Sequence, residues 1–130
     1  MNAPANRTSA VTAAIVAVLS LGACDAPSSG DSGEALFKKK CSSCHALVPG
    51  THKIGPSLAG VIGRKAGSTE FSSYRALKGA EFIWSVEEID KWIADPKAYI
   101  GQSTVMTVKI KDENDRKAII DYLKAAGGNG

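Results

Sequence analysis

The sequence predicts a small all-α domain in which helices are joined by long loops. The chain has 130 residues, which is enough for one domain and no more. No stretch alternates apolar and polar residues as a half-buried strand does. Thirteen glycines and five prolines, several of them in the middle of the chain, indicate extended loops. The net charge of +3 is spread along the sequence, so we expect no nucleic-acid partner.

The first segment has the pattern of an export signal. Polar residues with one positive charge, Arg7, precede an apolar run of 12 residues over 10–21. This run is shorter than the roughly 20 residues that a membrane-spanning helix needs. It ends in Leu21-Gly22-Ala23-Cys24, which resembles a bacterial lipobox. We therefore interpret residues 1–23 as a lipoprotein signal peptide that is removed, and Cys24 as the lipidated residue. The alternatives are an uncleaved N-terminal anchor and a soluble periplasmic protein.

Residues 24–32 are polar and contain Pro and Gly, which predicts a flexible linker between the lipid anchor and the domain. We place the folded domain at residues 33–127 and expect residues 128–130 to be a disordered tail. We therefore expect the domain to lie on the periplasmic face of the cell membrane, in an oxidising compartment.

The first half of the domain predicts one helix followed by loop. Residues 34–43 are expected to be helical, with Leu36 and Phe37 on one side. Residues 46–70 contain five glycines and are expected to be mostly loop. A short helix is expected at residues 72–78.

The second half carries clearer helix signals. Ser85 followed by Glu88 forms a capping box, which predicts a helix that stops near residue 95, before Pro96. Residues 97–111 are expected to be irregular. Asp112 is a candidate cap for a last helix, which the glycines after residue 126 would end.

Residues 41–45 read Cys-Ser-Ser-Cys-His, a C-x-x-C-H sequence typical of c-type haem attachment. One helical turn separates the thiols of Cys41 and Cys44, so both can reach the vinyl groups of one haem. His45 would then lie under the iron. A redox dithiol, a zinc site that includes His52 and a structural disulfide are the alternatives. The redox dithiol is weaker because the sequence shows no βαβ pattern. The zinc site is weaker because there is no second Cys pair. A disulfide between Cys41 and Cys44 would close too short a loop to stabilise the fold much.

The sixth iron position has two candidates. Met106 is the one methionine outside the signal segment, and it lies in an irregular stretch with few apolar neighbours. His52 is the other candidate. Ligation by His and Met raises the reduction potential of a haem and fills both axial positions, which favours electron transfer over catalysis.

These features together resemble a class I cytochrome c of the mitochondrial type, in a bacterial membrane-anchored form. Gly33 and Phe37 precede the haem motif at the family's spacing, and Ile119 and Tyr122 match the positions that cross them. The resemblance covers nearly the whole domain. It implies a small cytochrome c fold of about three to five helices around one covalent haem c.

The resemblance also assigns roles to loop residues. In the segment His-Lys-Ile-Gly-Pro at 52–56, it implies that His52 bonds the backbone rather than iron and that the Pro56 carbonyl orients His45. The iron ligands would then be His45 and Met106. The residues implied to contact the haem propionates are Arg64, Tyr74 and Trp84.

Four departures from the family pattern surround Met106. The loop 101–106 lacks the usual Pro and is one residue longer, and Val108 stands where an aromatic usually covers the haem edge. Trp92 replaces the tyrosine that usually bonds the Met sulfur, and Lys78 replaces an Asn.

The resemblance implies a monomeric electron carrier without enzymatic activity. Its expected partners are a cytochrome bc complex as donor and a terminal oxidase as acceptor. Five lysines are expected to surround the haem edge and steer it to acidic partners: Lys38, Lys39, Lys40, Lys53 and Lys97. The alternative function is a haem subunit of a periplasmic oxidoreductase or a peroxidase-like enzyme.

Overall fold

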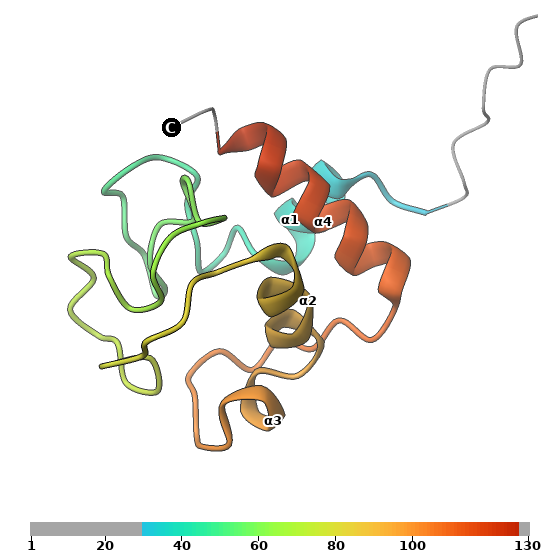
Figure 1. The fold of residues 1–130 in the computed structure, drawn as a ribbon. Helices are drawn as coiled ribbons and strands as arrows, with labels where there is room; N and C mark the ends of the chain where they lie inside the picture. Colours follow the sequence, from blue (N-terminus) through green and yellow to red (C-terminus); the bar gives the residue numbers. More distant parts are fainter. Residues whose placement is uncertain (1–29, 128–130) are drawn as a thin grey trace, which may run out of the picture.

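The computed structural model describes residues 30–127. The predicted signal peptide, Cys24, most of the linker and the tail 128–130 lie outside the described residues. Four helices occur in the described part, joined by long loops (Figure 1). They are α1 (Gly33–Lys40), α2 (Val86–Ala94), α3 (Pro96–Ile100) and α4 (Glu113–Ala126). The extended pairing in this part is limited to one isolated bridge between Lys65 and Ile83, so the all-α prediction is confirmed.

Helices α1 and α4 cross at close range, side by side in Figure 1. A Cβ on Gly33 would lie 2.1 Å from the carbonyl oxygen of Ala118, so only glycine allows this approach. The rings of Phe37 and Tyr122 fill the crossing at 5.5 Å between centroids, and Ile119 of α4 is fully buried. The predicted crossing is confirmed.

The caps of α2 and α4 are also confirmed. The Ser85 hydroxyl accepts a hydrogen bond from the Glu88 N–H at 3.2 Å, and the Asp112 carboxylate accepts from Asn114 and Asp115. Each cap satisfies N–H groups that a first helical turn leaves without partners.

Three helix predictions were wrong in detail. The first helix ends at Lys40, and Cys41–His45 form tight turns in which His45 N–H bonds the Cys41 carbonyl at 2.9 Å. Residues 72–78 form turns rather than a helix, and Gly79 takes a left-handed φ of 77°. Residues 97–111 are not wholly irregular, because Asp95 caps the short helix α3 and Gly101 ends it at φ 70°.

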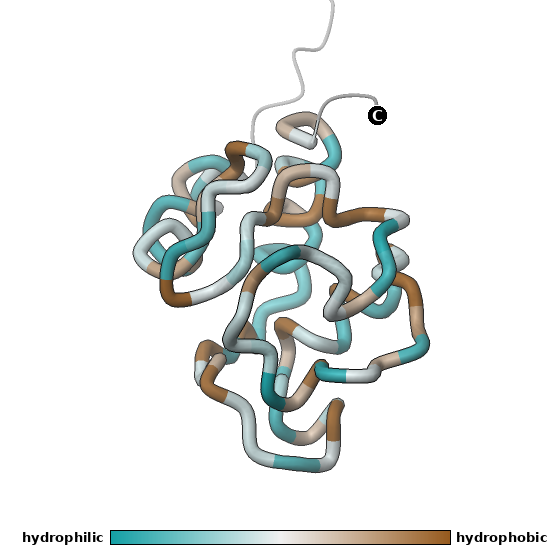
Figure 2. Tube along the Cα trace, turned by 90° about the vertical axis from the view of Figure 1, so that its left-hand side faces the viewer, coloured by the Kyte–Doolittle hydropathy of each residue, from teal (hydrophilic) through white to brown (hydrophobic). Residues whose placement is uncertain are grey.

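Much of the core comes from loop residues. Figure 2 shows apolar residues in short stretches along the trace, separated by polar ones. Backbone hydrogen bonds tie residues 63–66 to residues 82–84, among them Trp84 N–H to the Arg64 carbonyl at 2.9 Å. This tie places Arg64 and Trp84 on one wall of the interior. Over residues 30–127, no helix has the length and apolar character needed to cross a membrane.

Candidate functional site

A cavity of about 350 Å³ lies between the turns after α1, the central loops, α2, the Met106 segment and α4. Its size falls within the usual range for small-molecule and cofactor sites. All eight residues that the sequence predicted around a haem line this one cavity: Cys41, Cys44, His45, Pro56, Arg64, Tyr74, Trp84 and Met106. The structure thus brings together residues that are far apart in the chain.

His45 is buried and held in one orientation. Its Nδ1 lies 2.7 Å from the Pro56 carbonyl oxygen, the contact that the resemblance implied. A carbonyl only accepts, so Nδ1 carries the proton and Nε2 is the nitrogen available to a metal. Burial lowers the pKa of His45, opposed by the Pro56 bond and assisted by the nearby Lys53 charge. The imidazole is therefore kept neutral, as a metal ligand must be.

Gly55 makes room for the imidazole. A Cβ at Gly55 would lie 2.3 Å from Cε1 of His45. The backbone of Gly55 is fixed from both sides, because its N–H bonds the Cys44 carbonyl at 2.8 Å and its carbonyl accepts from Lys53 N–H at 2.9 Å. Gly55 was not predicted as a site residue, although its place directly before Pro56 in the segment 52–56 could have indicated a role.

The two cysteines of the motif have free thiols on the cavity wall. Burial, with a smaller contribution from Cys44, raises the pKa of Cys41 to about 11, so Cys41 is uncharged at neutral pH. An uncharged thioether suits this apolar position equally well. Within residues 30–127, no cluster of three or more His, Cys, Asp or Glu is placed so that it could hold a metal.

Met106 lines the cavity, and its sulfur accepts a hydrogen bond from another side chain. The Trp92 indole Nε1–H donates to Met106 Sδ at 3.0 Å, and Met106 N–H donates to the Thr104 hydroxyl at 3.2 Å. The sequence identified Trp92 as a departure from the family, and it did not predict that the indole would take over the sulfur contact.

His52 lies outside the cavity lining. Its Nδ1 accepts a hydrogen bond from Ser57 N–H at 3.0 Å, and its ring packs against Phe71 at 5.7 Å between centroids. This matches the backbone-bonding role that the resemblance implied. Met106 is therefore the better placed of the two candidates for the sixth position.

Arg64 points a partly satisfied guanidinium at the cavity. Nη1 donates to the Ala59 carbonyl at 2.8 Å and Nη2 to the Ser57 carbonyl at 2.9 Å. The Nε atom is buried and has no protein partner among the described residues. Burial lowers the pKa of Arg64, and a nearby carboxylate would offset that cost. An orphaned donor of this kind fits a haem propionate.

The other two predicted propionate contacts share this wall. The Tyr74 hydroxyl is within 2.7 Å of the Thr69 hydroxyl, and the Trp84 ring is buried edge-on between Phe82 and Trp92. Two thiols, one neutral imidazole, one thioether and one buried donor thus face a single apolar space. That donor set fits a covalently attached haem.

Comparisons with known proteins agree with the geometry. A family profile described as "Cytochrome c" matches residues 30–127. The chain is 40% identical over 108 residues to cytochrome c2 of Rhodopseudomonas palustris, covering 70% of this chain and 92% of that protein. It is 39% identical over 95 residues to cytochrome c of Theileria annulata, covering 72% and 83%. It is 37% identical over 102 residues to cytochrome c of Sesamum indicum, covering 77% and 92%. The chain belongs to the cytochrome c family.

Proposed function

We propose that this protein is a membrane-anchored periplasmic carrier of single electrons, which it receives from a cytochrome bc complex and delivers to a terminal oxidase. As a member of its family, it is a monohaem electron carrier with one covalent haem c and not an enzyme. The observation that supports the electron-carrier part of the proposal is the meeting of Cys41, Cys44, His45 and Met106 in one cavity.

Each of these residues has a distinct task. Cys41 and Cys44 would hold the haem through two thioether bonds, and His45 Nε2 and Met106 Sδ would bind its iron. The haem iron supplies the redox step, a one-electron change between ferric and ferrous. Pro56 holds the proton of His45 on Nδ1, which keeps Nε2 free and raises the basicity of the ligand.

Other residues adjust the surroundings of the haem. Arg64 uses its free Nε–H to neutralise a propionate, with Tyr74 and Trp84 as further donors. The mostly apolar walls lower the local dielectric constant, which would strengthen the electrostatic contacts of these donors with a haem.

The cavity opens beside a surface suited to brief docking. Ile54 is 69% exposed and Val105 62% exposed, and both belong to the cavity lining together with the cations Lys40 and Arg75. An apolar centre with positive charge around it supports short-lived contact with an acidic partner.

The five predicted docking lysines are not equivalent in their surroundings. Lys40 lines the cavity. Lys38 and Lys39 form exposed ion pairs with Glu34 and Asp31 at 2.7 and 3.8 Å, and the Lys53 ammonium donates to the Ser42 carbonyl. Lys97 lies on α3. Lys40 is therefore the strongest candidate of the five for steering.

Electron transfer is tested on the purified holoprotein. Haem colour should persist on a denaturing gel, and a purified cytochrome bc complex should reduce the protein at a rate that falls with ionic strength. Met106→Ala should abolish the near-infrared sulfur-to-iron band of the oxidised protein. A bis-histidine spectrum in the wild type, or no reduction by the complex, would contradict the proposal.

The anchor rests on the lipobox-like segment and the polar linker after it. Several acyl chains on one residue hold a protein stably at a bilayer, whereas one chain binds only marginally. Cys24→Ser should release intact, haem-loaded protein into the soluble periplasmic fraction. If that variant stays in the membrane with an N-terminus at Met1, the anchor is an uncleaved segment and the lipoprotein proposal is wrong.

A further inference from the structure

The chain between Met106 and α4 is fastened to α2 and its C-terminal cap. The Ile110 N–H donates to the Ile93 carbonyl at 2.9 Å, and the Lys109 ammonium lies 2.7 Å from the Asp95 carboxylate. A third attachment comes from Arg116, in the first turns of α4. The downstream side of Met106 is thus held by the same helix that carries Trp92.

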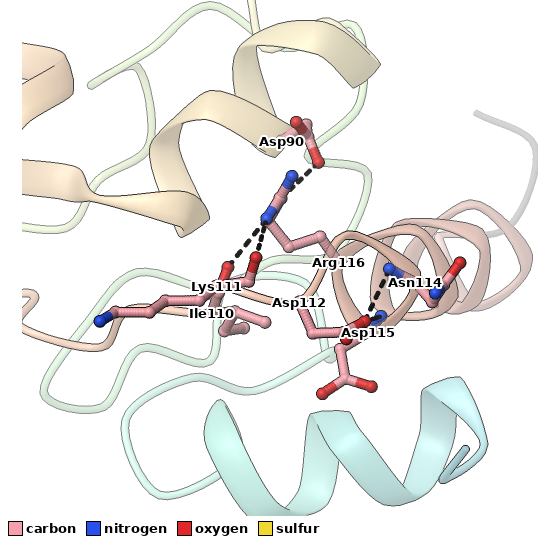
Figure 3. A network of polar contacts seen from close by, with 7 residues as sticks. All are labelled: Asp90, Ile110, Lys111, Asp112, Asn114, Asp115 and Arg116. Carbon is pink, nitrogen blue, oxygen red and sulfur yellow. Dashed lines mark hydrogen bonds and ion pairs between the residues drawn. The ribbon is translucent and has the colours of Figure 1, made fainter. Parts of the chain in front are cut away.

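Arg116 joins three parts of the chain through one guanidinium, as Figure 3 shows. Its Nε donates to Asp90 of α2 at 2.7 Å, and its Nη1 donates to the carbonyls of Ile110 and Lys111 at 3.1 and 2.8 Å. The Arg116 side chain is only 13% exposed, so these charge-assisted bonds are partly shielded from water. A lysine offers a single nitrogen and cannot reproduce this fork.

The segment that carries Met106 has few attachments to the rest of the protein. Over the described residues, no backbone-to-backbone hydrogen bond attaches residues 102–109 to the rest of the protein. Upstream, the Gly101 N–H bonds the Lys97 carbonyl at 3.0 Å and the Gln102 side chain donates to the Ala76 carbonyl at 3.1 Å, whereas the Thr104 hydroxyl accepts only from Met106 within the segment. Ile110 is therefore the first backbone anchor after Met106, and Arg116 binds the carbonyl of that same residue.

We propose that Arg116 is a positioning residue for the sixth iron ligand, an inference that rests on the proposed ligation by Met106. By fixing residues 110 and 111 against α2, Arg116 shortens the free segment on which Met106 can swing away from the cavity. Loss of the fork raises the population of the state in which Met106 has left the iron. An exogenous ligand binds that state, so its apparent affinity reports the population directly.

The test measures the dissociation constant of imidazole for the ferric holoprotein at one pH and salt concentration. Arg116→Lys keeps the positive charge but loses the fork, and it should bind imidazole roughly tenfold more tightly than the wild type. Asp90→Asn removes the charge that orients the guanidinium, and it should shift the constant in the same direction by less. This second variant keeps the test decisive if Arg116→Lys does not yield holoprotein.

Two reference variants separate the explanations. Met106→Ala gives the imidazole dissociation constant of a protein whose sixth iron position has no methionine ligand. Ile120→Val lowers the overall stability of α4 from a buried site outside the cavity lining, and it should leave imidazole binding within twofold of wild type. If Ile120→Val tightens binding as much as Arg116→Lys does, Arg116 acts only through general stability and the proposal is wrong.

The remaining outcomes are also distinct. If Met106→Ala binds tightly while Arg116→Lys and Asp90→Asn stay within twofold of wild type, ligation by Met106 stands and the role of Arg116 is overturned. If Met106→Ala binds imidazole no more tightly than wild type, Met106 is not the ligand, and both proposals fail together.

Discussion

The indole N–H of Trp92 donates a hydrogen bond to the sulfur of Met106 across 3.0 Å. The donor is fixed by α2 and by edge-on packing of the ring against Trp84 and Tyr99, at 5.4 and 5.8 Å between centroids. A hydrogen bond draws electron density from a thioether, which favours the less positive, ferrous state of a bound iron. The bond is therefore expected to raise the reduction potential as well as orient the sulfur.

Trp92→Phe should lower the reduction potential by a few tens of millivolts. The estimate follows because one net hydrogen bond is worth about 1 kcal/mol and a one-electron couple shifts by about 59 mV per tenfold change. Spectroelectrochemical titration measures it. Tyr99→Phe is the matched control, since it keeps the ring against Trp92 and removes a hydroxyl that bonds Glu88 and not Met106. Equal potentials for Trp92→Phe and wild type would show that the indole does not act on the sulfur.

Gly33→Ala should destabilise the α1–α4 crossing. The new Cβ would lie 2.1 Å from the Ala118 carbonyl oxygen, which is backbone and cannot turn aside. Overpacking of this kind costs about 1–3 kcal/mol of unfolding free energy, measured by guanidinium denaturation of the holoprotein. Gly30→Ala is the control, because its Cβ would meet nothing within 4 Å. Similar unfolding midpoints for the two variants would contradict the steric argument.

The Tyr99 hydroxyl should lose its proton only at unusually high pH. Burial first, and its hydrogen bond to Glu88 second, raise its pKa from 10.0 to about 12. An unfolded chain would ionise near 10, so the contribution of Tyr99 to stability is complete below that pH and is lost as pH rises towards 12. Carbon-13 NMR of labelled tyrosine rings follows the titration.

Glu88→Gln separates the two causes of the Tyr99 shift. The pKa of Tyr99 should fall in this variant without reaching 10.0, because burial remains. Glu87→Gln changes the same charge on the neighbouring residue and should leave Tyr99 unaffected. An unchanged Tyr99 titration in Glu88→Gln would mean that the carboxylate does not hold the phenol proton.

Local signals in the sequence predicted the longer helices, while tertiary contacts decided the rest. The caps at Ser85 and Asp112 act within one turn, so they could be read directly. The helix α3 was missed because five residues carry too little periodicity, although the Asp95 cap was visible. The helix predicted at residues 72–78 is absent. Residues of this segment, among them Tyr74 and Leu77, line the cavity from turns.

The residues of the site also fall into those that local sequence predicts and those that depend on tertiary contacts. Spacing alone identified the haem motif at residues 41–45, because its chemistry lies within one turn. The contacts of His45 with Pro56 and of Arg64 with the cavity join distant segments, and they were predicted only through the family resemblance. The resemblance marked Trp92 as a replacement at the position that usually bonds the Met sulfur, but it could not predict that the indole N–H keeps this contact.

Gly55→Ala should disturb the proximal side of the haem without unfolding the domain. The new Cβ would lie 2.3 Å from Cε1 and 2.8 Å from Nδ1 of His45. Since hydrogen bonds hold the Gly55 backbone on both sides, the imidazole must move and weaken its 2.7 Å contact with Pro56. A less basic, misdirected ligand should give less holoprotein per cell and a shifted NMR spectrum of the His45 ring.

Gly60→Ala is the control for this prediction. Gly60 has a left-handed φ of 60° and open space around its Cβ. The substitution should therefore cost about 1–2 kcal/mol of backbone strain and leave the His45 signals unchanged. If Gly55→Ala shows wild-type His45 signals, the loop gives way instead of the ring, and the cradle does not fix the imidazole.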